Sequence, residues 1–167
     1  MTDYEKEYRQ ATDVCGDPFP EFIAFFESAT RPYTVLDLGC GQGRDALMAA
    51  RFGHAVVGVD LAPTGISQMM AVAAAERLDV TGVVSDIEAY KPRTSFDVVI
   101  LDRVLHMLPT VERRIAQLDR SSSLIRHGGF VLVADTRSNR KRIADYFQDL
   151  AWVITLRRSD ILFVKRP

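Results

Sequence analysis

The feature that most constrains this sequence is the stretch VLDLGCGQGRDA at Val35–Ala46, followed by the run AVVGVD that ends at Asp60. It predicts an apolar strand, a turn with three glycines, a helix, and a second apolar strand that closes on a carboxylate. Such a unit is the first half of a nucleotide-binding α/β fold, because bare backbone at the turn lets a ligand lie against the chain. We therefore expect a ligand site at the carboxyl ends of parallel strands.

The spacing of the glycines separates two classes of ligand. A dinucleotide site needs the pattern G-x-G-x-x-G, and with Gly39 and Gly41 as its first pair the third glycine would fall at Arg44. The third glycine comes one residue early, at Gly43. Asp37 places a negative charge where a pyrophosphate would be repelled and a cation attracted. The pattern thus favours a sulfonium ligand with an α-amino group, against the alternatives of a nicotinamide dinucleotide or a purely structural turn.

The pattern D-x-G-x-G-x-G, with a strand before it and an acid-terminated strand after it, resembles the class I S-adenosylmethionine (SAM) dependent methyltransferases. This resemblance implies SAM as cofactor and S-adenosylhomocysteine as product. It implies that Asp37 anchors the ammonium group through water or a backbone amide. It also implies that Asp60 accepts hydrogen bonds from both ribose hydroxyls and that Leu61 packs on the adenine. Asp86 would lie beside the adenine amino group, with the Ile87 amide facing the ring. The expected cofactor-binding residues are Asp37, Gly39, Cys40, Gly41, Gly43, Asp60, Leu61, Asp86, Ile87, Asp102 and Arg103.

Structural roles are the alternatives for some of these residues. Burying Asp60 without partners would be costly, which favours a binding role for it. Asp86 has the alternative of capping a turn. Cys40 is expected in the turn because a small residue is needed there, and together with Cys15 it offers neither metal-ligand spacing nor a disulfide framework.

The end of the fourth predicted strand carries the residues expected to reach the methyl acceptor. Enzymes that methylate base amines have an N-P-P-Y or D-P-P-Y motif there, whereas this chain has Asp102-Arg103-Val104-Leu105. Together with Gly53–Met69, the Asp-Arg pair resembles the thiopurine and tellurite-resistance methyltransferases, which implies a small-molecule acceptor such as a thiol, a chalcogen oxyanion or another anion. The candidate catalytic residues are Asp102, Arg103, which would orient an anion, and His106, which would take a proton. The alternative for His106 is an ordinary helix-start residue.

Alternating strands and helices predict a Rossmann-like α/β fold. Short β-branched runs predict five parallel strands, at 34–38, 55–60, 80–85, 96–101 and 130–134. Helices are expected at 44–52, 63–78, 110–126 and 138–150, with Gly53, Pro63 and Ser138 at helix ends and an irregular turn at 87–95. The apolar stretches 152–156 and 161–164 predict a terminal hairpin. The resemblance implies a three-layer sandwich whose seven-stranded, mostly parallel sheet has the order 3-2-1-4-5-7-6, with strand 7 antiparallel.

Length and composition predict one domain over residues 1–167, with 1–30 as an N-terminal cap or lid and 31–167 as the core. With 47% hydrophobic residues, the chain can bury a sizeable core. No apolar run approaches the ~20 residues of a membrane span, and residues 1–10 are too charged for a secretory signal. We expect a cytoplasmic protein without a membrane partner. The helix around Phe22 would cover the sheet or close over the cofactor, and the sequence leaves the oligomeric state open.

Charge is distributed unevenly along the chain. Residues 1–102 hold 8 Lys and Arg against 16 Asp and Glu, whereas residues 103–167 hold 13 against 6. A basic half would suit an RNA or protein substrate, but these charges are not interleaved with aromatic residues as on a single-strand binding surface. We expect them on solvated helix faces and expect no nucleic-acid partner. The remaining alternative is a SAM-binding regulator without turnover, because no insertion fills the short loops.

Overall fold

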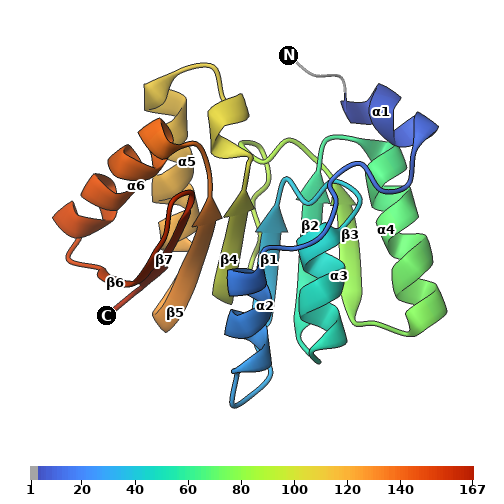
Figure 1. Ribbon diagram of the computed structural model, residues 1–167, viewed down its shortest axis with the longest axis horizontal. Coiled ribbons are helices and arrows are strands. Elements are labelled where there is room, and N and C mark those ends of the chain that lie inside the picture. Colours follow the sequence, from blue (N-terminus) through green and yellow to red (C-terminus); the bar gives the residue numbers. More distant parts are fainter. Residues whose placement is uncertain (1–3) are drawn as a thin grey trace. The chain divides into compact units, whose positions relative to one another are not determined.

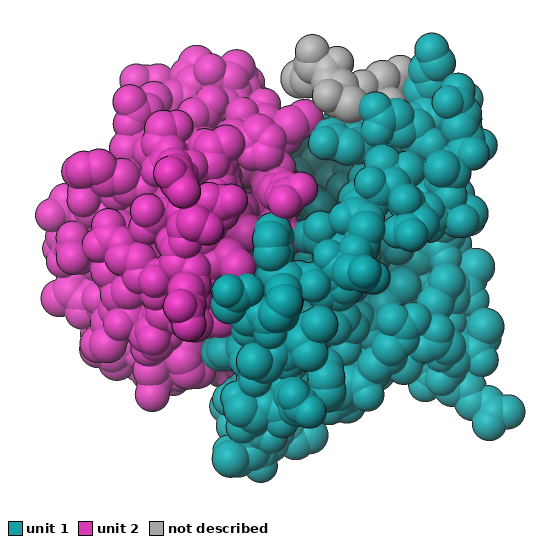
Figure 2. Space-filling view, viewed as in Figure 1, with its two compact units in different colours: residues 1–91 teal, residues 92–167 magenta. Residues whose placement is uncertain are grey.

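The computed structural model describes residues 4–167, in which seven strands follow the order β3-β2-β1-β4-β5-β7-β6 (Figure 1). Strand β7 is antiparallel to both of its neighbours. The fold class, the strand order and the reversed seventh strand are thus confirmed. The chain divides into two compact units, residues 1–91 and 92–167 (Figure 2). Residues 1–3 of the predicted cap lie outside the described residues, and within 4–167 no helix is both long and apolar enough to cross a membrane.

The first unit contains the strands on either side of the glycine-rich turn. Its elements are α1 (Tyr4–Gln10), α2 (Pro20–Glu27), β1 (Thr34–Leu38), α3 (Arg44–Arg51), β2 (Ala55–Asp60), α4 (Pro63–Glu76) and β3 (Val80–Val84). Strand β2 pairs in parallel with both β1 and β3, with Leu38 opposite Val59 and Asp60 opposite Val84. The carboxyl ends of the three strands therefore meet at one edge, where the glycine-rich turn and Asp60 lie.

The second unit carries the remaining four strands. Its elements are β4 (Phe96–Asp102), the 3-10 helix η1 (Leu105–Met107), α5 (Val111–Ser123), β5 (Ile125–Ala134), α6 (Arg137–Asp149), β6 (Val153–Arg157) and β7 (Ile161–Lys165). Strands β4 and β5 are parallel, and Asp102 lies opposite Ala134. Asp102 and the residue that follows β5, Asp135, thus come to the same edge. The terminal hairpin predicted from its two apolar stretches is confirmed as β6 and β7.

Local backbone chemistry explains the element ends that the sequence predicted. Gly53, with φ of 87°, follows the C-cap of α3, and Pro63 is the first residue of α4. The predicted irregular turn 87–95 contains neither helix nor strand. Ser138, however, does not cap a helix: α6 starts at Arg137, and its N-cap residue Thr136 makes no side-chain capping bond. The short helix η1 was not predicted.

The boundary between α5 and β5 was predicted wrongly. The helix expected to reach Arg126 ends at Ser123, and β5 begins at Ile125, five residues before the predicted start. Gly128 and Gly129, which lie between the predicted helix and the predicted strand, are inside β5. Gly128 has φ of 76°, and a Cβ on Gly129 would lie only 2.6 Å from the Asp97 carbonyl oxygen. Here the glycines permit an irregular, closely packed strand and do not end an element.

A buried histidine ties α2 to the first strand pair. His54 Nδ1 accepts a hydrogen bond from the Tyr33 N–H at 3.0 Å, and its Nε2 lies 3.4 Å from the Phe26 carbonyl oxygen. Its ring stacks on that of Tyr33 at 5.3 Å between centroids. These partners require the neutral ring with its hydrogen on Nε2. Burial lowers the pKa of His54 from its ordinary value of 6.5.

We expect the free energy of unfolding to fall as the pH drops from 6.5 towards the lowered pKa of His54. In that window the unfolded chain binds more protons than the folded one, so the slope reaches at most about 1.4 kcal/mol per pH unit from this group. Urea unfolding of the protein and of His54→Gln between pH 7.5 and 5.5 measures it. The variant should lose the slope, and His127→Gln, at an exposed histidine, should keep it. Equal slopes in all three would contradict the assignment.

Candidate cofactor and acceptor sites

The turn after β1 is built from glycines in the left-handed region. The φ angles are 80° at Gly39, 55° at Gly41 and 86° at Gly43, where side chains with a Cβ are disfavoured. The N–H groups of Gly39 and Cys40 both donate to the Val59 carbonyl, at 2.7 and 3.1 Å. These bonds hold the turn against the end of β2. The predicted glycine positions therefore share one small, bare stretch of backbone at the start of α3.

Asp60 joins this turn to the start of α4. Its Oδ2 accepts from the Gly41 N–H at 2.9 Å, and its Oδ1 accepts from the Ala62 N–H at 2.8 Å. Each carboxylate oxygen has two lone pairs and can accept a further donor. The two backbone bonds fix the orientation of a half-buried carboxylate. This arrangement suits an acceptor for a pair of hydroxyl groups.

Asp37 is a buried carboxylate, 2% exposed, whose Oδ2 has no hydrogen-bond partner within residues 4–167. Burial, followed by the negative charge of Asp45, raises the pKa of Asp37 well above its ordinary value of 3.8, and the Arg44 guanidinium only partly opposes this. Asp60 adds a further negative charge. A buried charge without a partner is costly, and a cation held here would offset that cost. The residues present thus fit the ammonium group of SAM.

Replacing Asp37 by Asn should weaken SAM binding and stabilise the free protein. Loss of one charged interaction, about 1.5–3 kcal/mol, corresponds to at least a tenfold weaker affinity. Because the folded-state pKa is raised, the wild-type chain loses stability as the pH rises above 3.8. Asn removes that penalty, so its free energy of unfolding should exceed that of the wild type at pH 7, with a smaller difference below pH 3.8. Calorimetry and urea unfolding measure the two quantities; unchanged SAM affinity would remove Asp37 from the site.

The residues expected around the adenine lie at the ends of β2 and β3. Leu61 is 68% exposed, so its side chain is available to a flat ligand. Ile87 is buried, and the adjacent Asp86 is exposed. Asp86 Oδ1 accepts from the Glu88 N–H at 2.8 Å, which is the turn-capping contact given above as its alternative. Its role beside an adenine therefore stays a prediction.

Two glutamines, Gln42 and Gln68, hold the N-terminal segment against the glycine-rich turn. Neither is among the predicted site residues. Gln42 Nε2 donates to the Ala11 carbonyl at 2.6 Å, and its Oε1 accepts from the Val14 N–H at 2.9 Å. Gln42 also donates to Gln68, whose Nε2 donates to the Tyr8 carbonyl at 2.8 Å. Through these hydrogen bonds, Gln42 and Gln68 hold residues 8–14 against the turn. Neither glutamine follows a pattern that would have singled it out.

Tyr8 occupies the space above the glycines. A Cβ on Gly41 would lie 2.4 Å from the Tyr8 hydroxyl oxygen, and one on Gly65 would lie 2.9 Å from its ring. At the other end of α1, the Glu5 carboxylate accepts from both the backbone N–H and the hydroxyl of Thr64, at 3.0 and 2.6 Å. Glu5 thereby caps the first turn of α4, which has no capping side chain of its own. That this segment opens and closes as a lid stays a prediction.

In the second unit, the residues after β4 adopt an unusual backbone. Asp102 is half-buried at the end of the strand, and the exposed Arg103 has φ of 51°. Its N–H donates to the Ala134 carbonyl oxygen at 2.7 Å, which holds the chain in this conformation. A left-handed residue with a side chain costs about 1 kcal/mol or more and is often found at functional sites. The strain falls on Arg103, one of the two residues of the predicted Asp102-Arg103 pair.

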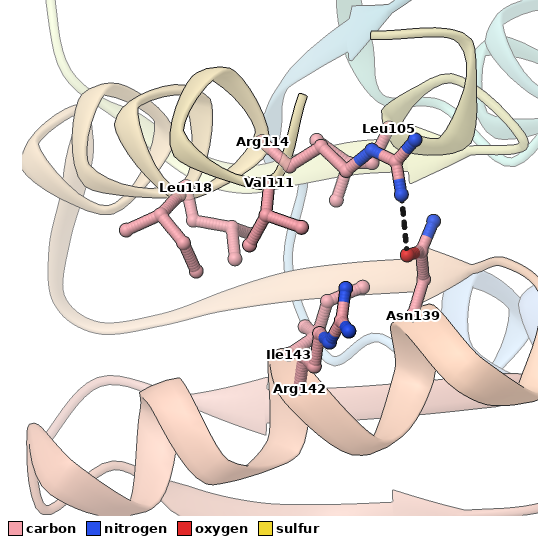
Figure 3. Close-up of a pocket in the computed structure, with 8 residues that line it drawn as sticks. Leu105, Val111, Arg114, Leu118, Asn139, Arg142 and Ile143 are labelled. Carbon is pink, nitrogen blue, oxygen red and sulfur yellow. Dashed lines mark hydrogen bonds between the residues drawn. The ribbon is translucent and has the colours of Figure 1, made fainter. Parts of the chain in front are cut away.

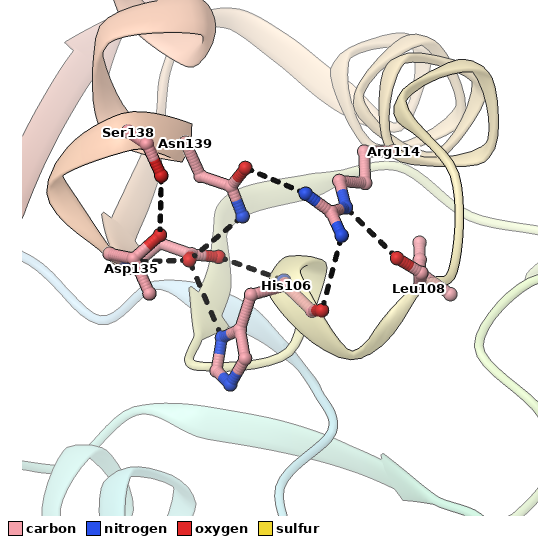
Figure 4. Close-up of polar contacts among 7 residues, drawn as sticks. His106, Leu108, Arg114, Asp135, Ser138 and Asn139 are labelled. Carbon is pink, nitrogen blue, oxygen red and sulfur yellow. Dashed lines mark hydrogen bonds and ion pairs between the residues drawn. The ribbon is translucent and has the colours of Figure 1, made fainter. Parts of the chain in front are cut away.

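His106 is the middle residue of η1 and faces a buried carboxylate (Figure 4). Its backbone N–H donates to Asp135 Oδ2 at 3.1 Å, and its ring Nδ1 lies 3.4 Å from Asp135 Oδ1. The second unit thus brings His106 together with Asp135, which is not among the predicted site residues. A sequence signal was present, because Asp135 directly follows the apolar end of β5, much as Asp60 ends the apolar strand β2.

A pocket in the second unit lies between η1, α5 and α6 (Figure 3). It is lined mainly by the apolar side chains of Leu105, Val111, Leu118 and Ile143. Arg114 and Asn139 close one end, where they hydrogen-bond to each other at 2.8 Å. None of the predicted site residues lines this pocket. It is a gap in helix packing rather than a candidate site.

An α/β fold with a bare glycine-rich turn after β1, an acid at the end of β2 and an antiparallel β7 defines the class I SAM-dependent methyltransferases. The sequence matches the family described as a methyltransferase domain over residues 35–129, and the chain belongs to this family. The cofactor of such methyltransferases is SAM. The family and cofactor predicted from the glycine-rich turn are confirmed.

Similar proteins include enzymes named for small molecules. The chain is 37% identical over 98 residues to 2-heptyl-1-hydroxyquinolin-4(1H)-one methyltransferase of Mycobacteroides abscessus, covering 56% of this chain and 42% of that protein. The chain thus spans less than half of this curated relative. The fold is similar to TehB from Haemophilus influenzae, with a TM-score of 0.75, 18% identity and coverage of 98% and 67%. It is also similar to 1,6-didemethyltoxoflavin-N1-methyltransferase from Burkholderia thailandensis, with a TM-score of 0.79, 19% identity and coverage of 98% and 85%.

Proposed function

We propose that this chain transfers the methyl group of SAM to a small-molecule acceptor, with a thiol, a chalcogen oxyanion or another anion as the first candidates. The observation that carries the proposal is Asp37, a buried carboxylate beside the glycine-rich turn whose Oδ2 has no hydrogen-bond partner within residues 4–167. A cationic ligand stabilises this carboxylate, whereas the phosphates of a dinucleotide would be repelled. Bound SAM supplies an activated methyl group, so the chain's task is to align the acceptor and exclude water.

The roles that we propose for the side chains are those implied by the resemblance to the SAM-dependent methyltransferases. Asp37 would pair with the ammonium group, and Asp60 would accept from the ribose hydroxyls. Leu61 would cover one face of the adenine, and Arg103 would orient the acceptor. We propose further contacts with the cofactor for Gly39, Cys40, Gly41, Gly43, Asp86, Ile87 and Asp102.

A small acceptor is favoured by the loops and by the relatives. Only residues 103–110 separate β4 from α5, and only two residues separate β5 from α6, so no inserted domain is present there to grip a macromolecule. One relative in sequence and one in fold are named for small heterocyclic substrates. We further propose that the two units act as one cytoplasmic methyltransferase domain, with residues 1–30 as its cap.

Calorimetry with SAM, S-adenosylhomocysteine and NAD tests the cofactor part of the proposal. Binding of the first two and not of NAD is expected, and tight NAD binding would overturn it. Methyl transfer from labelled SAM to thiols, selenite and tellurite tests the acceptor part. Label transfer only to RNA or protein would favour a macromolecular substrate, and SAM binding without transfer to any acceptor would favour a regulator.

A further inference from the structure

Asp135 is a completely buried carboxylate with a dense set of donors. It follows β5, and its side chain is 0% exposed. Its Oδ1 accepts from the Thr136 N–H at 2.6 Å and from Asn139 Nδ2 at 3.1 Å, and its Oδ2 accepts from the His106 N–H at 3.1 Å (Figure 4). These three hydrogen bonds restrain both oxygens of the carboxylate. The side chain is therefore fixed and oriented before any ligand arrives.

This carboxylate faces one nitrogen of the His106 ring. Nδ1 lies 3.4 Å from Asp135 Oδ1, a distance that is longer than an ordinary hydrogen bond. Such contacts are often long in free enzymes and shorten when the substrate binds. The His106 side chain is 32% exposed while Asp135 is not. The carboxylate thus favours the tautomer with hydrogen on Nδ1, which leaves the Nε2 lone pair to accept a proton.

Arg114 holds the residues around Asp135 and His106 in place. Arg114 donates to the Leu108 carbonyl at 2.9 Å, to Asn139 Oδ1 at 2.8 Å and to the His106 carbonyl at 3.4 Å. It therefore connects η1, which carries His106, to α6, which carries Asn139. The Arg114 guanidinium donates to the backbone carbonyl of His106 and not to its ring. These bonds therefore fix the position of the imidazole without involving the ring nitrogens.

We propose that Asp135 is a positioning residue that makes His106 the proton acceptor for the methyl acceptor. The inference rests on the proposed function and narrows its substrate class to acceptors that carry a proton on the reacting atom, such as a thiol or a hydroxyl. In the step, the acceptor X–H loses its proton to His106 Nε2 while the X–CH₃ bond forms and the CH₃–S bond breaks. The products are the methylated acceptor, a neutral thioether and an imidazolium that Asp135 stabilises, so charge is conserved.

A series of thiols and phenols of graded acidity tests the proposal. For acceptors that remain protonated at the assay pH, His106→Gln and Asp135→Asn should each lower kcat by about 100-fold or more. For acceptors that are already ionised, the same variants should lower kcat by less than about threefold, because no proton has to be removed. The KM for SAM should change little. Asp145→Asn, which removes an exposed carboxylate of α6, should behave as the wild type on every acceptor.

Equal losses on ionised and protonated acceptors would show that Asp135 is merely structural and would overturn the proposal. Because Asp135→Asn loses an acceptor for buried donors and can unfold, His106→Ala with added imidazole is the second variant. Its activity should recover at least tenfold on protonated acceptors only, and absence of recovery counts against the proposal.

A spectroscopic measurement separates this inference from the proposed function. Long-range ¹⁵N NMR of the histidine rings should show His106 with hydrogen on Nδ1 in the wild type and a mixture in Asp135→Asn. Hydrogen on Nε2 in the wild type would overturn the inference even if methyl transfer is found. An inactive wild type with the expected tautomer would instead contradict the proposed function alone.

Discussion

Replacing Asp60 by Ala should lower SAM affinity by roughly 100-fold or more. The carboxylate would accept hydrogen bonds from two ribose hydroxyls, and each charged hydrogen bond contributes about 1.5–3 kcal/mol. Two such bonds correspond to at least about 3 kcal/mol, and every 1.4 kcal/mol is tenfold in affinity. Titration calorimetry with SAM and with S-adenosylhomocysteine measures the loss, which should be similar for both because they share the ribose.

The same substitution removes the acceptor for the N–H groups of Gly41 and Ala62. Thermal unfolding must therefore accompany the binding data, and Asp60→Asn, which keeps one acceptor oxygen, separates lost contacts from a disordered turn. Asp79→Ala, at an exposed acid before β3, serves as the control for a change of charge. A folded Asp60→Ala protein with wild-type affinity would show that Asp60 only shapes the turn.

Arg103→Ala should depress methyl transfer far more than it weakens SAM binding. If the guanidinium orients an anionic or thiol acceptor, its loss disturbs alignment, and poor alignment alone can lower the rate ~100-fold. The substitution keeps a Cβ at φ of 51°, so backbone strain is unchanged. Initial rates with saturating SAM and binding titrations, run on the same preparations, provide the comparison.

Two further variants make this comparison sharper. Arg103→Lys keeps the charge but loses the planar fork, so a bidentate contact with an oxyanion predicts a loss close to that of alanine. Arg113→Ala, at an exposed arginine in the first turn of α5, controls for positive charge in this unit. Equal losses in turnover and in SAM affinity would identify Arg103 as a cofactor ligand only.

The strands were predictable because burial on both faces leaves a continuous apolar run between turn residues. Thr34–Leu38 and Ala55–Asp60 were predicted to the residue for this reason. The start of β5 was not, because the polar and glycine-rich run Arg126–Gly129 carries no apolar periodicity. The register with β4 passes from Ile125 to Phe130 and skips this segment. Gly128 and Gly129 instead exchange backbone hydrogen bonds with Arg166, and Gly129 lies against the Asp97 carbonyl oxygen, so the segment is ordered by long-range contacts.

The candidate site likewise contains residues that the sequence predicts and residues that it does not predict. Asp37 and Asp60 follow from the spacing of the motif, since the backbone turn itself determines where they lie. The partner of His106 is Asp135, which is 29 residues further along the chain and reaches it only because β4 and β5 end at the same edge. The contacts of Gln42 with Ala11 and of Gln68 with Tyr8 depend on how the N-terminal segment lies against the turn and α4, which residue spacing does not predict.

The buried carboxylate of Asp37 has a consequence for the protein in a cell. The buried carboxylate of Asp37 destabilises the folded chain until a cation binds beside it. Binding of a cationic ligand therefore raises the free energy of unfolding. A ligand at 100 times its Kd stabilises the folded state by about 2.7 kcal/mol, and abundance in cells responds several-fold to differences of that size. If SAM binds at Asp37 as proposed, its supply should influence the amount of folded protein, because the ligand-free chain is the less stable one.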